Sequence, residues 1–189
     1  MKQLVCLLEE PSAEAMLKVV CRSILPAEVQ TRYIVFEGKQ DMDKQLEKKL
    51  KHWNAPDSVF LVMRDQDSSD CLTIKQSLKH KVVAAGKIDK AVIRIACHEL
   101  ESFYLGDLEA VEQGIGLRGL SSMQGKSRFR EPDSIANAAQ VLKKLTKSKY
   151  QKISGSRAIA SFLKLDGANR SHSFNVLLSG IKKLIEEQQ

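Results

Sequence analysis

The chain has 189 residues, of which 43% are hydrophobic, 28% are charged and 5% are aromatic, and its formal net charge is +7. A chain of this length buries enough surface to fold as one or two domains without a disulfide or a structural metal. The few aromatic residues argue against an aromatic stacking surface. No apolar run approaches the roughly 20 residues of a membrane span. The short apolar start has no signal-peptide cleavage site, so the sequence predicts a cytoplasmic protein with no membrane partner.

Apolar runs alternate with amphipathic segments over the first hundred residues. We expect strands at 2–8, 32–36, 59–63 and 91–96, and helices at 13–25, 41–53 and 70–85 between them. Further along, we expect helices at 107–113, 132–147, 156–165 and 173–187, with a loop over 114–130. Alternating strands and helices predict an α/β fold with a mostly parallel central sheet and flanking helices.

The domain organisation follows from where the strand signals stop. Residues 1–113 would form the α/β core, and residues 114–189 a basic loop and a C-terminal helical cap packed on it as a single unit. The four cysteines (Cys6, Cys21, Cys71 and Cys97) include no C-x-x-C pair, so we interpret them as structural.

Acidic residues follow three of the four expected strands: Glu9 and Glu10, then Asp65 and Asp67, then Glu99 and Glu101. Ligands of open parallel sheets bind beyond the carboxyl ends of the strands. Carboxylate oxygens are the ligands that Mg²⁺ prefers, and such a metal can activate water for attack on a phosphodiester.

Each pair also has a structural interpretation. Asp65 and Asp67 could cap the following helix, Glu9 could be an N-terminal helix charge, and Glu99 and Glu101 could face solvent at a helix start. Their joint placement favours a metal site, because gathered like charges repel unless a cation compensates them.

Positive charge is concentrated in one stretch. Residues 118–152 contain nine basic and two acidic residues, whereas residues 1–117 contain 16 basic and 18 acidic residues. The stretch is either a polyanion-binding surface or a solvated helix face. The candidate nucleic-acid contacts are Arg118, Lys126, Arg128 and Arg130.

Three segments carry a resemblance. Residues 8–15 (LEEPSAEA) with Asp65-Gln66-Asp67 resemble the signature of Toprim (topoisomerase–primase) domains. Residues 101–107 (ESFYLGD) and 170–174 (RSHSF) resemble a small Toprim-like group, domain-of-unknown-function family 4276. The resemblance implies a Toprim-like fold and a nuclease that uses Mg²⁺ or Mn²⁺.

Carried over by residue, the resemblance makes Glu9, Asp65 and Asp67 the catalytic metal ligands. Glu14 and Glu101 would serve a second metal or its waters. It also implies a partner ATPase and a role in phage defence. Glu10 departs from the pattern, because it stands where the family usually has glycine.

Two alternatives to the nuclease remain open. The chain could be a non-catalytic nucleic-acid or partner-binding subunit with a degenerate acidic site. It could instead be a haloacid-dehalogenase-like phosphatase, in which Asp65 attacks phosphorus and Asp67 acts as acid or base. That interpretation leaves Glu9 without a role.

Overall fold

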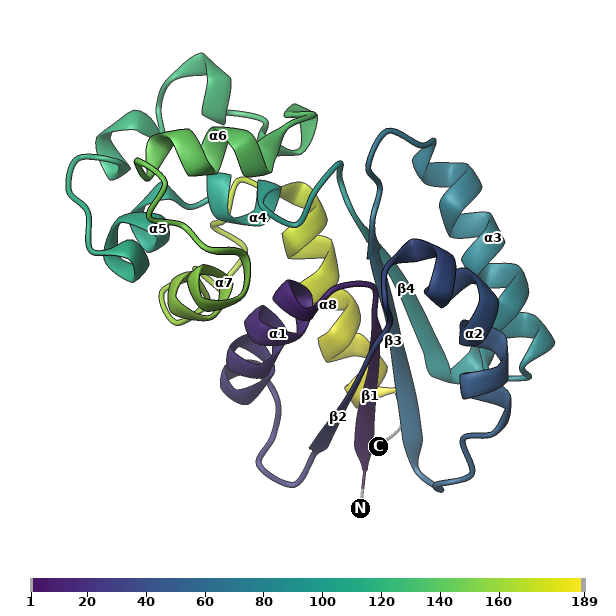
Figure 1. Ribbon diagram of the computed structural model, residues 1–189. Helices are drawn as coiled ribbons and strands as arrows, with labels where there is room; N and C mark the ends of the chain where they lie inside the picture. The colour runs from purple at the N-terminus through teal and green to yellow at the C-terminus, as the bar shows by residue number, and fades with distance from the viewer. Residues whose placement is uncertain (1, 188–189) are drawn as a thin grey trace.

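A computed structural model describes residues 2–187 of the chain and contains one four-stranded sheet (Figure 1). The strands are β1 (Gln3–Leu8), β2 (Gln30–Val35), β3 (Ser58–Asp65) and β4 (Ala91–Ala96). All neighbouring strands are parallel, in the order β2-β1-β3-β4. The predicted α/β class and parallel sheet are confirmed, and the arrangement is consistent with a Toprim-like fold.

Eight α-helices and four short 3₁₀ turns connect and cover the strands in the described residues. The α-helices are α1 (Pro11–Ile24), α2 (Lys39–Lys51), α3 (Cys71–Ala84), α4 (Ser102–Leu105), α5 (Leu108–Ile115), α6 (Ala138–Leu145), α7 (Lys152–Ala160) and α8 (His172–Glu186). The 3₁₀ turns are η1 (Ile88–Lys90), η2 (Ser121–Met123), η3 (Ser127–Phe129) and η4 (Pro132–Ser134).

The two faces of the sheet bury different helices, because successive side chains of a strand point to opposite faces. Leu4, Cys6 and Leu8 of β1 belong to the core shared with α1 and α8. Val5 and Leu7 belong to the core shared with α2 and α3. Figure 1 shows these pairs of helices on opposite sides of the sheet.

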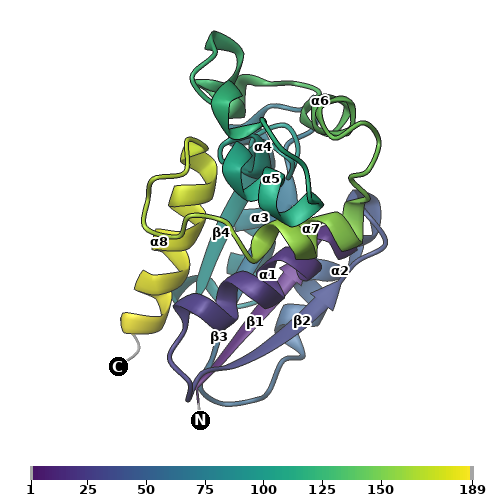
Figure 2. The same ribbon diagram turned by 90° about the vertical axis from the view of Figure 1, so that its left-hand side faces the viewer.

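Helices α4 to α6 lie beyond the carboxyl ends of the strands, in teal to green at the upper left of Figure 1, and α7 lies beside α1 on the side away from the sheet. Helix α7 packs along α1, and α5 packs on α7 (Figure 2). Helix α8 then returns to the sheet and packs on β4. Of the expected cap, α6 therefore lies beyond the strand ends, α7 lies against α1, and α8 covers a sheet face.

Two predicted helices have different bounds in the structure. The segment 132–147 is a 3₁₀ turn followed by α6, and the helix expected at 156–165 is α7, which ends at Ala160. The prediction began that helix at Ser156, whereas α7 begins at Lys152. Gly155 lies within α7, and a Cβ at this position would lie 2.5 Å from Cδ2 of Tyr150, so the packing of α7 on Tyr150 requires glycine here.

All four cysteines are free, and Cys6 and Cys21 are buried, as expected of structural cysteines. No helix within residues 2–187 is long and apolar enough to cross a membrane.

Candidate active site at the carboxyl edge of the sheet

The candidate site lies beside β1, where successive strands are added to the sheet first on one side and then on the other. From β1 the chain passes to β2 on one side, and β3 lies on the other side of β1. The crevice beyond the carboxyl ends of two such strands is where open α/β sheets bind ligands. Glu9 follows β1 and Asp65 ends β3, so both lie at this point.

Glu9 is tied into the end of the sheet. Its side chain is buried, and Oε2 accepts a hydrogen bond from the backbone N of Asp65 at 3.1 Å. The same oxygen lies 3.7 Å from Nε of Arg64, a buried side chain that also reaches Asp43. Burial raises the pKa of the Glu9 carboxyl, although Arg64 and the Asp65 amide act against this shift.

Asp65, at the end of β3, is anchored by the loop that follows β4. Its Oδ2 accepts a hydrogen bond from the backbone N of Leu100, in the loop after β4, at 3.2 Å. Burial raises the pKa of the Asp65 carboxyl well above its usual range. The charges of Glu10, Glu101 and Glu9 raise that pKa further.

Asp67 lies in the turn after β3 and is only partly buried. The turn gives it a φ of 54°, a left-handed conformation that aspartate tolerates better than most residues. Its Oδ2 lies 3.2 Å from Nζ of Lys39, at the start of α2. The side chains of the two aspartates therefore have different partners, Leu100 for Asp65 and Lys39 for Asp67. The backbone of Asp67 is nevertheless bound to His98 in the loop after β4, at 2.7 Å.

Glu101 joins Asp65 from the β4 side. It is 1% exposed, and its Oε1 accepts a hydrogen bond from the hydroxyl of Tyr150 at 2.8 Å. Its Oε2 is buried without a hydrogen-bond partner, and burial raises the pKa of its carboxyl. Glu14, by contrast, pairs with Lys18 on α1 at 2.7 Å.

A lysine 142 positions further along the chain than Glu10 completes the cluster. Nζ of Lys152, the first residue of α7, lies 2.7 Å from Oε2 of Glu10. Burial lowers the pKa of Lys152, but the hydrogen bond and charge of Glu10, with the charges of Glu101 and Asp65, raise it overall. Sequence reasoning counted Lys152 in the basic stretch and missed its contact with the acids, as it missed Tyr150.

The structure thus gathers Glu9, Glu10, Asp65 and Glu101, which we call the acidic cluster. The crevice among Glu9, Glu10 and Asp65 has a volume of about 10 Å³, enough for about one water molecule. Within residues 2–187, no three His, Cys, Asp or Glu side chains are arranged so that they could hold a metal ion. The acids are brought together, but backbone amides, Tyr150 and Lys152 already engage them.

The segments 101–107 and 169–174 are interlocked. Asn169 donates from Nδ2 to the backbone oxygen of Phe103 at 3.0 Å, and the rings of Phe103 and Phe174 lie 5.1 Å apart. A Cβ on Gly106 would lie 2.1 Å from Oδ1 of Asn169. These motif residues therefore hold α4 against the start of α8, which fixes the loop that carries Glu101.

The sequence model of a family described as "Domain of unknown function (DUF4276)" matches residues 8–182. The chain belongs to this family. The DUF4276 match includes the whole acidic cluster, Lys152 and the interlocked segments. No curated protein and no solved structure matches the chain. The broader Toprim resemblance stays a prediction.

The predicted nucleic-acid contacts of this DUF4276 protein lie in the segment between α5 and α6. Gln124 anchors the segment by accepting from the backbone N of Leu108 at 2.6 Å and by donating to the backbone oxygens of Leu105 and Phe129. The predicted contacts are all exposed: Arg118, Lys126, Arg128 and Arg130.

Proposed function

We propose that this DUF4276 protein is a Mg²⁺- or Mn²⁺-dependent phosphoryl-transfer enzyme, a nuclease that acts on DNA or RNA. The observation that carries the proposal is Asp65, a buried carboxylate surrounded by three other carboxylates at the switch point of a parallel sheet. Such an arrangement costs stability unless a cation offsets the repulsion. Perturbed acids in a crevice are typical of functional sites.

The acids fit a hard divalent cation by their chemistry, since every candidate ligand is a carboxylate. The buried, unpartnered Oε2 of Glu101 is a further free donor atom. Glu9, Asp65 and Glu101 would hold the metal after their carboxylates turn from their present partners, since they are not arranged as a ligand set in this structure. Asp67 would contribute from the adjacent turn. A bound metal would supply Lewis-acid activation of water and of the phosphodiester.

The chain's own residues would position the substrate. Lys152 and Lys39 place ammonium groups beside the acids, where they would attract phosphate oxygens. Arg64 does not serve in this way, because it is 8% exposed and is paired with Glu9 and Asp43. The exposed basic residues between α5 and α6 would hold the nucleic-acid backbone. The partner ATPase and the role in phage defence rest on the family resemblance alone.

One observation favours the second candidate, a non-catalytic nucleic-acid or partner-binding subunit. Lys152 already compensates Glu10, and the Asp65 and Leu100 amides already bind the two central carboxylates. A degenerate site, held together by an internal cation instead of a metal, would have these contacts.

A cleavage assay separates the two candidates. Labelled single-stranded and double-stranded DNA and RNA are incubated with the protein and Mg²⁺, Mn²⁺ or EDTA. We expect metal-dependent cleavage that falls on the order of a hundredfold in Asp65→Asn and Glu9→Gln. The control is Asp89→Asn, an exposed acid in η1 before β4. Cleavage that persists in EDTA, or equally in all variants, would contradict the proposal, and metal-independent binding without cleavage would favour the subunit.

A further inference from the structure

Strand β2 forms an edge of the sheet, and the side of β2 that faces away from β1 offers free backbone groups. The backbone N of Gln30 donates to Lys2, and that of Phe36 donates to Leu8 at the end of β1. Alternate residues of a strand direct their N–H and C=O groups to opposite sides. Thr31, Tyr33 and Val35 therefore present theirs outward, along the edge visible in Figure 2.

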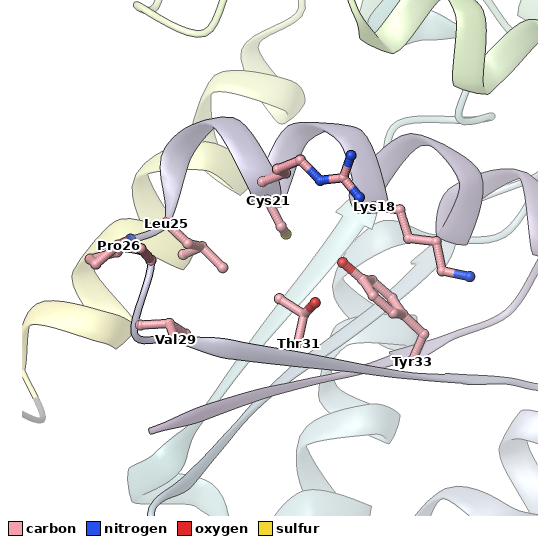
Figure 3. A pocket seen from close by; sticks show the side chains of 9 residues that line it. Lys18, Cys21, Leu25, Pro26, Val29, Thr31 and Tyr33 are labelled. Atoms are coloured by element: carbon pink, nitrogen blue, oxygen red, sulfur yellow. The ribbon is translucent and has the colours of Figure 1, made fainter. Parts of the chain in front are cut away.

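A cavity of about 460 Å³ lies between α1 and this edge, on the α1 face of the sheet. Figure 3 shows Cys21 of α1 and Leu25, which follows that helix, above it and Thr31 and Tyr33 of β2 below. Two cations one helical turn apart, Lys18 and Arg22, also line it.

A second cavity, of about 390 Å³, lies on the other face of the same strand. It is lined by Ile34 of β2 and by α2 with the residues that follow it, among them Lys48, Lys49 and Trp53. The side chains of Tyr33 and Ile34 therefore reach opposite cavities, as the alternation of a strand requires.

Both cavities are lined by basic residues and by no acidic residue. Within the described chain, no ion pair involves Arg22, Arg32, Lys48 or Lys49, whereas Lys18 pairs with Glu14. A second copy of the chain that paired through β2 would bring these cations against their equivalents. The charges therefore disfavour a second copy and favour an acidic occupant.

We propose that β2 is a docking edge for an acidic, extended segment of another protein, which adds to the sheet as a fifth strand. Its backbone would bond to Thr31, Tyr33 and Val35. Its alternate side chains would enter the two cavities, with carboxylates toward Arg22 on one face and Lys49 on the other. Main-chain bonds supply affinity in this mode of recognition, and the flanking pockets supply specificity.

The probe is a fluorescein-labelled peptide of about eight residues with the repeated sequence Glu-Glu-Thr-Val, which gives each face alternating carboxylates. Its binding to the full chain is followed by fluorescence anisotropy. A matched peptide carries N-methyl groups on two adjacent central residues, which blocks strand pairing by either edge. We expect the methylated peptide to bind roughly tenfold more weakly, which is about 1.4 kcal/mol.

Two pairs of variants test the backbone and the charges separately. Thr31→Pro removes an outward N–H but leaves the pairing with β1, and Thr31→Val keeps that N–H. Arg22→Glu with Lys49→Glu reverses the charge of both cavities, and Lys75→Glu with Lys79→Glu makes the same change on the exposed face of α3. We expect the peptide to bind roughly tenfold more weakly to Thr31→Pro and to the double variant Arg22→Glu with Lys49→Glu. Its binding to Thr31→Val and to Lys75→Glu with Lys79→Glu should be unchanged. Circular dichroism confirms that each variant is folded.

Several results would overturn the proposal. One is an absence of peptide binding to the wild-type chain; another is equal binding of the methylated peptide or of Thr31→Pro, which would leave only charge attraction. If a single-stranded oligonucleotide displaces the peptide, and its own binding is lost in the Arg22→Glu with Lys49→Glu variant, the surface binds nucleic acid. If light scattering shows a dimer that Arg22→Glu dissociates, a second copy is the occupant. None of these results depends on whether the acidic cluster cleaves nucleic acid.

Discussion

Nζ of Lys152 lies 2.7 Å from Oε2 of Glu10, although 142 positions separate the two residues in the chain. Glu10 stands where the family resemblance leads one to expect glycine. Lys152 supplies the positive charge that this extra carboxylate requires beside Asp65 and Glu101. The departure from the family pattern is thus compensated within the structure.

Replacing Lys152 with methionine should lower the free energy of unfolding near neutral pH. The ion pair is about half exposed, so the expected loss is only about 0.2–1 kcal/mol, and added salt should shrink it. Urea unfolding at two salt concentrations measures the effect. Lys149→Met is the matched control, an exposed lysine three residues earlier. Equal stability of the two variants would show that Lys152 does not compensate the cluster.

Asp65→Asn and Asp67→Asn should affect stability differently. Asparagine at 65 can still accept the Leu100 hydrogen bond and removes a buried charge, so the metal-free protein should become more stable. At position 67 the change removes an exposed pair with Lys39 and should stay within about 0.5 kcal/mol. Thermal melts in EDTA make the comparison. If both variants melt earlier than the wild type, the aspartates are structural.

The acidic cluster also predicts a pH dependence of stability. The pKa values of Asp65, Glu9 and Glu101 are raised in the folded protein, so the folded state binds protons more tightly than the unfolded state. Stability should therefore fall as the pH rises from about 4, the ordinary carboxyl value, through the raised folded values. When urea unfolding is measured across this pH range, the free energy of unfolding of Asp65→Asn should decline less steeply than that of the wild type. A wild-type stability that rises steadily over the same range would contradict this assignment.

Gly106→Ala tests the junction between α4 and α8. The new Cβ would lie 2.1 Å from Oδ1 of Asn169 and 2.6 Å from the backbone N of Ser171, so the backbone must shift. Overpacking of this kind costs about 1–3 kcal/mol. At Gly125 a Cβ would meet nothing within 4 Å, so Gly125→Ala is the control and should change stability by less than about 0.5 kcal/mol. Equal melting temperatures would show that the junction is loosely packed.

Replacing Arg128 and Arg130 together with alanine should weaken nucleic-acid binding in a sequence-independent way. If both contact phosphate, the slope of log affinity against log salt should flatten by roughly two units. Filter binding over a salt series measures the slope, and alanine at Lys75 and Lys79 on α3 serves as the control pair. An unchanged slope would leave the two arginines as solvated surface.

The sheet and the first acids of the site could be predicted because their signals are local. Apolar runs mark all four strands, and parallel strands bring their carboxyl ends to one edge. That rule is sufficient to place Glu9, Asp65 and Glu101 together. Two other acids behave differently from the prediction of a shared metal site. Asp67 is held by Lys39, and Glu14 pairs with Lys18 within its own helix.

Lys152 and Tyr150 could not be placed from the sequence, because their contacts depend on where α7 packs. That placement needs the close approach of Gly155 to the Tyr150 ring and two successive left-handed residues, Lys147 and Ser148, in the turn after α6. No periodic pattern reports either feature. Helix α4 was missed for a related reason, since four residues are too few to show a helical period.

The position of α8 also sets the order in which the chain can mature during synthesis. Part of one face of β3 and β4 is covered by Phe174, Leu177 and Ile181 of α8, a helix that is synthesised after all four strands. At roughly 5–20 residues per second, that face waits on the order of ten seconds or more for its cover. Lys152, which pairs with Glu10, is also synthesised long after Glu9, Glu10 and Asp65. The nascent chain therefore carries its acids long before it carries either their counter-ion or the helix that closes the core.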